Sequence, residues 1–151
     1  MLVPGKLRDN FRGLADVWEF LRVAPRLRAA HVLKARLPVA DLLQRFTPPV
    51  RGEPQEDHVG ALQRYVWWWL GRRWLRVPGN CWTRSLVLFE LLRRYGFGDV
   101  RLIVGVRKDA EDLAGHAWLE RGGQPFLEPD WEEVRGMKPL IEHPTEEAPP
   151  P

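Results

Sequence analysis

Four residues in the second half of the chain have side chains suited to nucleophilic catalysis: Cys81, His116, Glu128 and Asp130. A cysteine attacks a carbonyl only as the thiolate, which needs a base, usually histidine, and a carboxylate that orients the base. Cys81 is the only cysteine among 151 residues, so no internal disulfide can form. The alternative role for such a lone cysteine is that of a small, inert core residue.

The segment NCWTRSLVLFELLRRYG, residues 80–96, predicts a helix that begins beside Cys81. Asn80 is a favoured N-cap, Gly96 is a favoured C-terminal stop, and apolar residues recur between them at helical spacing. The free N–H groups and the dipole of a helix N-terminus favour an anionic thiolate. The sequence therefore places Cys81 where a thiol is most easily activated.

His116 is the histidine best placed to act as the base, because it lies in a predicted strand. His31 falls among N-terminal helices, His58 in a charged loop and His143 in the tail. The stretches HAWLER and QPFLEPD flank two glycines and predict a β-hairpin. The third member of a catalytic set would then lie on the second strand of this hairpin.

The length of the hairpin loop decides which acid faces His116. A two-residue turn at Gly122-Gly123 leaves no acid on the face of His116. A three-residue loop over 121–123 places Glu128 directly opposite, and a loop that starts one residue later places Asp130 there. We favour the loop over 121–123, and hence Glu128, with Asp130 as the alternative.

Helices precede strands along the chain, which predicts an α+β domain. Residues 1–50 predict a helical segment that packs on the core, with a first helix ended or kinked at Pro25 and a short one after Pro38. Residues 51–135 predict the core, with a strand over 100–106 and a loop over 108–115. Residues 136–151 predict a flexible charged tail, and the whole forms one compact domain.

The stretch YVWWWLGRRWL, residues 65–75, lies in a predicted helix that is apolar on two faces. One interpretation is a central helix packed on both sides. The other is that some of Trp67, Trp68 and Trp74 form an exposed patch for a protein or peptide partner.

Composition narrows the functional class. The net charge is +3, and no nucleic-acid-binding motif accompanies the spread-out arginines, so we expect no nucleic-acid partner. The N-terminal residues lack the apolar core of a signal peptide, and the longest apolar run is too short to span a bilayer. We therefore expect a cytoplasmic protein. One cysteine and scattered histidines give no metal-site spacing, and no cofactor is expected.

The segments CWTRSLVLFELLRRYGF, VRLIVGVRKD and GHAWLERGGQPFLE resemble the transglutaminase-like leader peptidases of lasso-peptide biosynthesis. That family shares a Cys followed three residues later by Arg, an apolar helix ending in Arg-Arg-x-Gly, a strand ending in Gly-Val and a His-Ala-Trp strand. The resemblance covers about residues 78–130. The family usually has Asp twelve residues after its His, where this chain has Glu128, with Asp130 two residues further on.

This resemblance implies a transglutaminase-like or papain-like cysteine peptidase fold, in which a helical N-terminal half precedes a small antiparallel sheet. It implies removal of the leader from a ribosomally made lasso precursor: Cys81 attacks the scissile carbonyl, His116 transfers the proton, and Glu128 or Asp130 holds the imidazole. The backbone N–H of Cys81 would stabilise the oxyanion. Candidate contacts to substrate or partner are Trp68, Trp74, Trp82, Arg84 and Trp118.

The resemblance also implies partners. In that family a small separate domain of winged-helix type often presents the leader, and no extra segment of about 80 residues here could play that role. We therefore expect the stand-alone protease half of a split B protein, with a separate recognition protein. The precursor peptide and the ATP-using lasso cyclase are the other expected partners.

Two other functions fit the same residues. A transglutaminase-like site can pass its acyl group to an amine, which would make the protein an acyl transferase or amidase on another peptide. The chain would instead be a non-catalytic peptide-binding module if Cys81 were structural and the Trp-rich helix held a partner.

Overall fold

The computed structural model describes residues 11–109 and 112–145. The elements follow one another as α1 (Leu14–Lys34), α2 (Val39–Arg45), η2 (Glu56–His58), α3 (Val59–Leu70), η3 (Arg73–Leu75), α4 (Cys81–Arg94), β1 (Val100–Asp109), β2 (Asp112–Arg121), β3 (Gln124–Phe126), α5 (Trp131–Val134) and β4 (Lys138–His143), where η marks a 3₁₀ turn. Helices come first and strands follow, so the predicted α+β class is confirmed.

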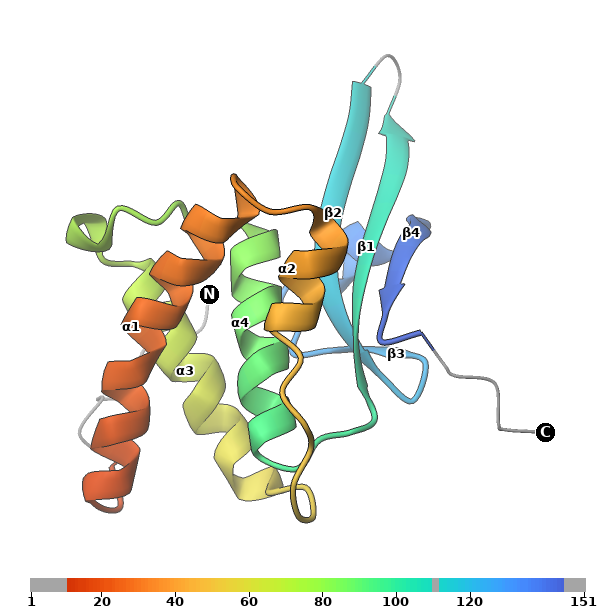
Figure 1. Cartoon of the computed structure of the whole chain (residues 1–151). Coiled ribbons are helices and arrows are strands. Elements are labelled where there is room, and N and C mark those ends of the chain that lie inside the picture. Colours follow the sequence, from red (N-terminus) through yellow and green to blue (C-terminus); the bar gives the residue numbers. More distant parts are fainter. Residues whose placement is uncertain (1–10, 110–111, 146–151) are drawn as a thin grey trace.

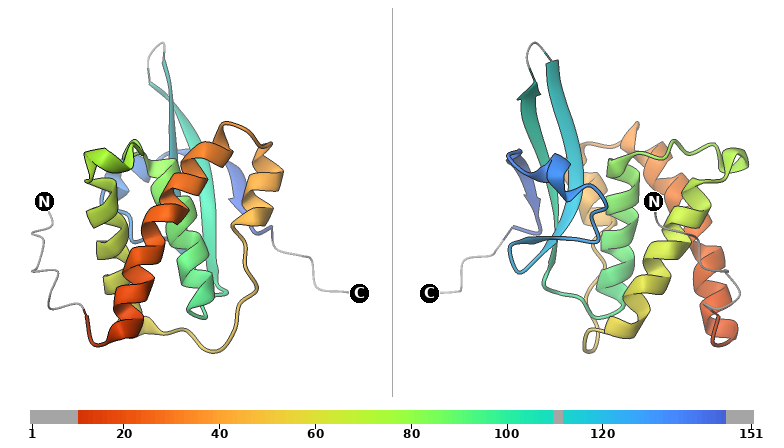
Figure 2. Two further views of the ribbon diagram at one scale, coloured as in Figure 1. Left: turned by 60° about the vertical axis from the view of Figure 1, so that its left-hand side comes forward. Right: turned by 180° about the vertical axis from the view of Figure 1, so that it is seen from behind.

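Helix α4 is the centre of the fold. It packs against α1 and α3 on one side and against β1 and β2 on the other, as Figures 1 and 2 show. Every residue from Thr83 to Leu92 is buried. A helix that must satisfy neighbours on both sides needs apolar residues around most of its circumference, which explains the density of leucine in this segment.

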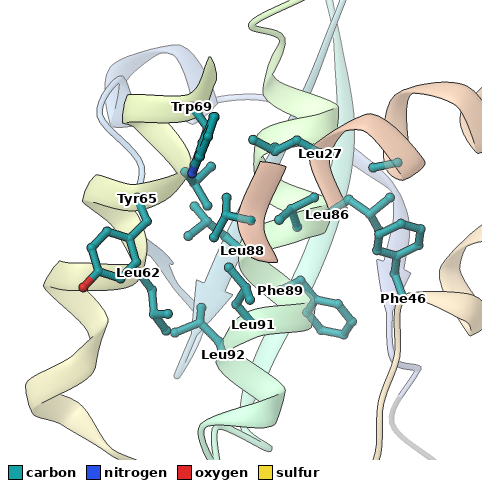
Figure 3. Close-up of a cluster of buried hydrophobic side chains, with 14 of the residues drawn as sticks. Leu27, Phe46, Leu62, Tyr65, Trp69, Leu86, Leu88, Phe89, Leu91 and Leu92 are labelled. Atoms are coloured by element: carbon teal, nitrogen blue, oxygen red, sulfur yellow. The ribbon is translucent and has the colours of Figure 1, made fainter. Parts of the chain in front are cut away.

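The main core lies between α4 and the other helices (Figure 3). Leucine and aromatic side chains from α1 to α4 interdigitate there, and Val100, Leu102 and Leu119 add the face of the sheet that is turned toward α4. Helices α1 and α2 thus supply part of the same core. The labelled members in Figure 3 are Leu27, Phe46, Leu62, Tyr65, Trp69, Leu86, Leu88, Phe89, Leu91 and Leu92.

The sheet is antiparallel, with the strand order β3-β2-β1-β4. Strands β1 and β2 form a long hairpin whose pairing runs from Val100–Arg121 to Asp109–Asp112. The predicted loop over 108–115 is therefore wrong for 108–109 and 112–115, which are strand residues, whereas 110–111 lie outside the described residues. Pairing across the hairpin satisfies the backbone of this polar segment, which its composition did not indicate.

Helix α1 corrects the prediction of a break at Pro25. It is one helix of 21 residues with Pro25 inside it. The N–H that proline lacks would have bonded the carbonyl of Leu21, and both residues are exposed, so water can satisfy that carbonyl. No helix in the described ranges is long and apolar enough to cross a membrane.

Strand β4 corrects the prediction of a flexible tail over 136–151. Residues Lys138–His143 pair with β1 and form an edge of the sheet, and 146–151 lie outside the described residues. An edge strand with one solvated face tolerates charged residues at alternate positions. Ile141 faces inward, against the main core, while Leu140 and Glu142 are exposed.

Candidate active site

Cys81 is the first residue of α4 and is half-buried. The Asn80 side chain accepts a hydrogen bond from the Thr83 N–H at 2.8 Å, which confirms the predicted N-cap. The Asn80 carbonyl accepts the Arg84 N–H at 3.2 Å. The N–H groups of Cys81 and Trp82 are consequently the ones that the start of the helix leaves for a ligand.

A cavity of about 420 Å³ lies beside Cys81. Its lining comes from both layers of the fold, and the side chains around it are mostly apolar. Cys81 and His116 both line this cavity, although no hydrogen bond joins the thiol to the imidazole among the described residues. The lining residues are Lys34, Val39, Leu42, Asn80, Cys81, Trp82, Val104, Gly115, His116, Ala117 and Ile141.

His116 lies on β2, opposite Gly105 of β1, and is 7% exposed. Its ring stacks on Trp118 with a centroid distance of 6.3 Å. Its Nε2 lies 3.3 Å from Glu128 Oε1, close enough for an ion pair, but no hydrogen bond is aligned along this contact and Nε2 is buried without another partner. A buried ring nitrogen without a hydrogen bond is costly, and such atoms occur at sites that act on a ligand.

Glu128 reaches His116 by a route that differs from the predicted one. Arg121 pairs with Gln124, so the turn has two residues, Gly122 and Gly123, and the predicted three-residue loop is wrong. Both glycines have positive φ, as two-residue hairpin turns require. Strand β3 ends at Phe126, before Pro129 can disturb it.

The chain leaves the sheet directly after β3. Leu127 adopts φ +58°, a left-handed conformation that is uncommon for leucine. The side chain of Glu128 then turns inward and is only 2% exposed. Asp130 is exposed, and its backbone N–H donates to Glu128 Oε1 at 3.3 Å. Glu128, and not Asp130, is the predicted acid that the structure brings to His116.

The residues predicted to contact a substrate or partner are distributed over different environments. Arg84 and Trp118 are in the interior, with 7% and 2% exposure, so neither is available to a partner at the surface. Trp82 is half-buried and lines the cavity next to Cys81. Trp68 is half-buried under the Arg72 guanidinium, whereas Trp74 is 67% exposed.

The Trp-rich segment 65–75 has both buried and exposed tryptophans, so each of the two interpretations, core helix and exposed patch, holds for part of it. Trp69 is buried and its indole N–H donates to the Phe20 carbonyl at 2.8 Å, as a core residue would. Trp67 of α3 and Trp74 of η3 are exposed. Helix α3 is thus packed on one side, and Trp67 lies at the surface together with Trp74 of the turn that follows.

One residue near the site escaped the sequence analysis. Glu133 Oε2, on α5, lies 3.8 Å from His116 Nδ1. Nothing in the spacing of Glu133 pointed to it, because a four-residue helix after an irregular turn places it there. In the part of the chain that the structure describes, no three His, Cys, Asp or Glu side chains are grouped as metal ligands would be.

Comparison with known proteins gives one match. A family model of the transglutaminase-like superfamily matches residues 21–142, which is more than half of the chain and includes Cys81, His116 and Glu128. No curated protein and no solved structure matches. The superfamily includes cysteine peptidases and acyl transferases, and its domains are typically cysteine-dependent enzymes. The α+β architecture and the extent of the match agree: this chain belongs to the transglutaminase-like superfamily.

Proposed function

We propose that this protein is a cysteine peptidase that removes the leader from a ribosomally made lasso-peptide precursor. The observation that supports cysteine chemistry is that Cys81, at a helix N-terminus, and His116 line the same cavity. The contact between His116 and the buried Glu128 carboxylate supports it. The resemblance of residues 78–130 to lasso leader peptidases supports the choice of substrate.

In this proposal His116 takes the thiol proton and the Cys81 thiolate attacks the scissile carbonyl carbon. The developing oxyanion lies near the N–H groups of Cys81 and Trp82, which are free at the start of α4. The imidazolium then gives its proton to the leaving amine, and an acyl thioester remains. Water attacks the thioester, His116 takes the water proton, and the released thiolate recovers it.

The cavity supports a peptide substrate. About 420 Å³ is within the range of ligand pockets and accommodates several side chains of an extended peptide. Its walls are mostly apolar, with Leu42 and Ile141 on opposite layers, and the ammonium of Lys34 lies 6.0 Å from the centre of the Trp82 ring. These walls offer apolar contacts to a peptide and leave the site open to the water that hydrolyses the thioester.

The direct test is cleavage of a lasso-precursor peptide, with product masses determined by mass spectrometry. The purified protein should release the leader with a free carboxyl terminus, and Cys81→Ala should release none. Hydrolysis in the presence of an added primary amine supports the peptidase, whereas a product carrying the amine would favour acyl transfer. Equal cleavage by Cys81→Ala, or none by the wild type, would contradict the proposal.

We also propose that a separate leader-recognition protein of winged-helix type docks on the exposed aromatic surface that includes Trp74, and that the lasso cyclase acts next. Exposed tryptophans beside arginines are common in binding surfaces. Trp74→Ala should weaken binding of the recognition protein, measured by calorimetry, without changing cooperative melting. Trp69→Ala, which removes a buried ring, is the matched variant that should lower the melting temperature instead.

A further inference from the structure

Arg84 lies one turn after Cys81 on α4 and is buried. A guanidinium in the interior requires a partner for its charge. Its Nη2 donates to Glu128 Oε2 at 2.8 Å, with only 9% of the Arg84 side chain and 2% of the Glu128 side chain exposed. The guanidinium also lies 5.3 Å from the centre of the Trp67 ring. This ion pair therefore joins α4 to the segment after β3 within the protein.

Glu128 uses its two oxygens for different partners. Oε2 accepts from Arg84, whereas Oε1 lies 3.3 Å from His116 Nε2 and accepts the Asp130 N–H. Strand β3 ends at Phe126, so no strand pairing holds Glu128 in place. The direction of its carboxylate therefore depends on side-chain contacts, and the contact with Arg84 is the shortest of them.

We propose that Arg84 is a positioning residue of this active site, which holds the Glu128 carboxylate in the direction of His116. The inference rests on the peptidase function proposed above. Without its counter-ion, a carboxylate in this interior would turn toward water. Turned away from His116, it could not stabilise the imidazolium that forms when His116 holds the thiol proton.

The chain offers a control for the loss of an ion pair from the same helix. Arg26 of α1 pairs with Glu90 of α4, whose side chain is 7% exposed and also pairs with Arg94, and among the described residues this pair has no contact with Cys81 or His116. Arg26→Met should therefore lower stability and leave the chemistry intact. Arg84→Met removes the charge at the site with a similar change of shape, and Arg84→Lys keeps the charge without the planar fork.

The experiment compares the four proteins in steady-state cleavage of the precursor peptide from pH 5 to 9. Arg84→Met should lower kcat by roughly 10²-fold, as misplacement of a catalytic group does, with KM nearly unchanged. Arg84→Lys should recover part of the kcat, and Arg26→Met should match the wild type in both kcat and KM.

A second readout needs no peptide substrate. Cys81 is the only cysteine, so the rate of iodoacetamide labelling at pH 6 reports its thiolate directly. Labelling should be slower in Arg84→Met than in the wild type and in Arg26→Met. If the wild type does not cleave the precursor, the peptidase function fails, while this order of labelling rates still tests the role of Arg84.

Two results would overturn the inference. The first is an Arg84→Met protein with the kcat and labelling rate of the wild type. The second is an equal loss of activity in Arg84→Met and Arg26→Met together with equal labelling rates, which would make the Arg84 ion pair merely structural. If Arg84→Met does not fold, Arg84→Lys carries the same readouts, and wild-type values for it in both would count against the inference.

Discussion

Replacing Gly105 with alanine should destabilise the sheet beside His116. Gly105 pairs with His116 across β1 and β2. A Cβ at this position would lie 2.6 Å from Trp118 Cη2, 2.8 Å from Trp118 Cζ3 and 3.1 Å from the Lys138 carbonyl oxygen. Trp118 is 2% exposed and packs in a small cluster with Ile103, so its ring has no free space into which to move.

Unbonded carbon atoms pack at roughly 3.5–4 Å, so the Trp118 ring or β4 must shift by about 1 Å. Overpacking of this kind costs about 1–3 kcal/mol. For a chain of this length that corresponds to a fall in Tm of roughly 3–10 °C, measured by circular dichroism. Because Trp118 stacks on His116, the shift should also disturb the imidazole and slow cleavage of the precursor.

Gly115→Ala on the neighbouring strand is the control for stability. A Cβ there would meet only the Gly105 carbonyl oxygen, at 3.9 Å, which is an ordinary contact. We expect its Tm to equal or slightly exceed that of the wild type, since alanine loses less backbone entropy on folding. If Gly105→Ala and Gly115→Ala melt together, the packing of Trp118 over Gly105 is not what limits this part of the sheet.

Three further predictions concern titratable residues. His116→Ala should slow precursor cleavage by roughly 10³-fold or more and reduce labelling of Cys81 at pH 6; unchanged labelling would mean that the two side chains do not interact. Glu128→Gln should reduce turnover by up to about 10⁴-fold, whereas Asp130→Asn should stay near wild type because Asp130 is exposed; the reverse order would exclude Glu128. Burial, and to a lesser extent the Arg93 charge, lower the pKa of His143 below its ordinary 6.5. Below about pH 6.5 the unfolded chain therefore binds more protons than the folded one, and the free energy of unfolding should fall as the pH drops. Urea unfolding from pH 7 to 5 measures this slope, which His143→Gln should flatten.

The helix that carries Cys81 could be predicted because local signals determine it. Asn80 caps it, apolar residues fill it, and the structure begins the helix at Cys81 as expected. Helix α1 shows the limit of the same reasoning. Its apolar residues Leu14 and Trp18 recur at helical spacing, yet they are 82% and 63% exposed, while a second apolar face that includes Leu27 is buried. Periodicity predicts a helix but does not choose between two apolar faces.

Strand β4 could not be predicted because its stability comes from its neighbour. Residues Lys138–His143 have too few apolar side chains to indicate a strand on their own. They pair with the open edge of β1, which supplies the backbone hydrogen bonds. The long β1–β2 hairpin poses the same problem, since Lys108, Asp109 and Asp112 are polar and yet belong to strands that pair with each other.

Local sequence signals and contacts between distant segments together determine which acid lies beside His116. Strand alternation predicted which acid would face His116 only under a loop length that the structure does not have. Glu128 lies beside His116 because β3 ends at Phe126 and Leu127 turns the chain. No residue type in this segment predicts the end of the strand or the turn. Arg84 does give a sequence signal, since it and Glu90 are the two charged residues in the buried run of α4 from Thr83 to Leu92. A buried arginine must find an anion, and the carboxylate that satisfies it is the one that lies against His116. The turn at Leu127 and the ion pair with Arg84 thus act together to hold Glu128 against His116, whereas Asp130 stays exposed.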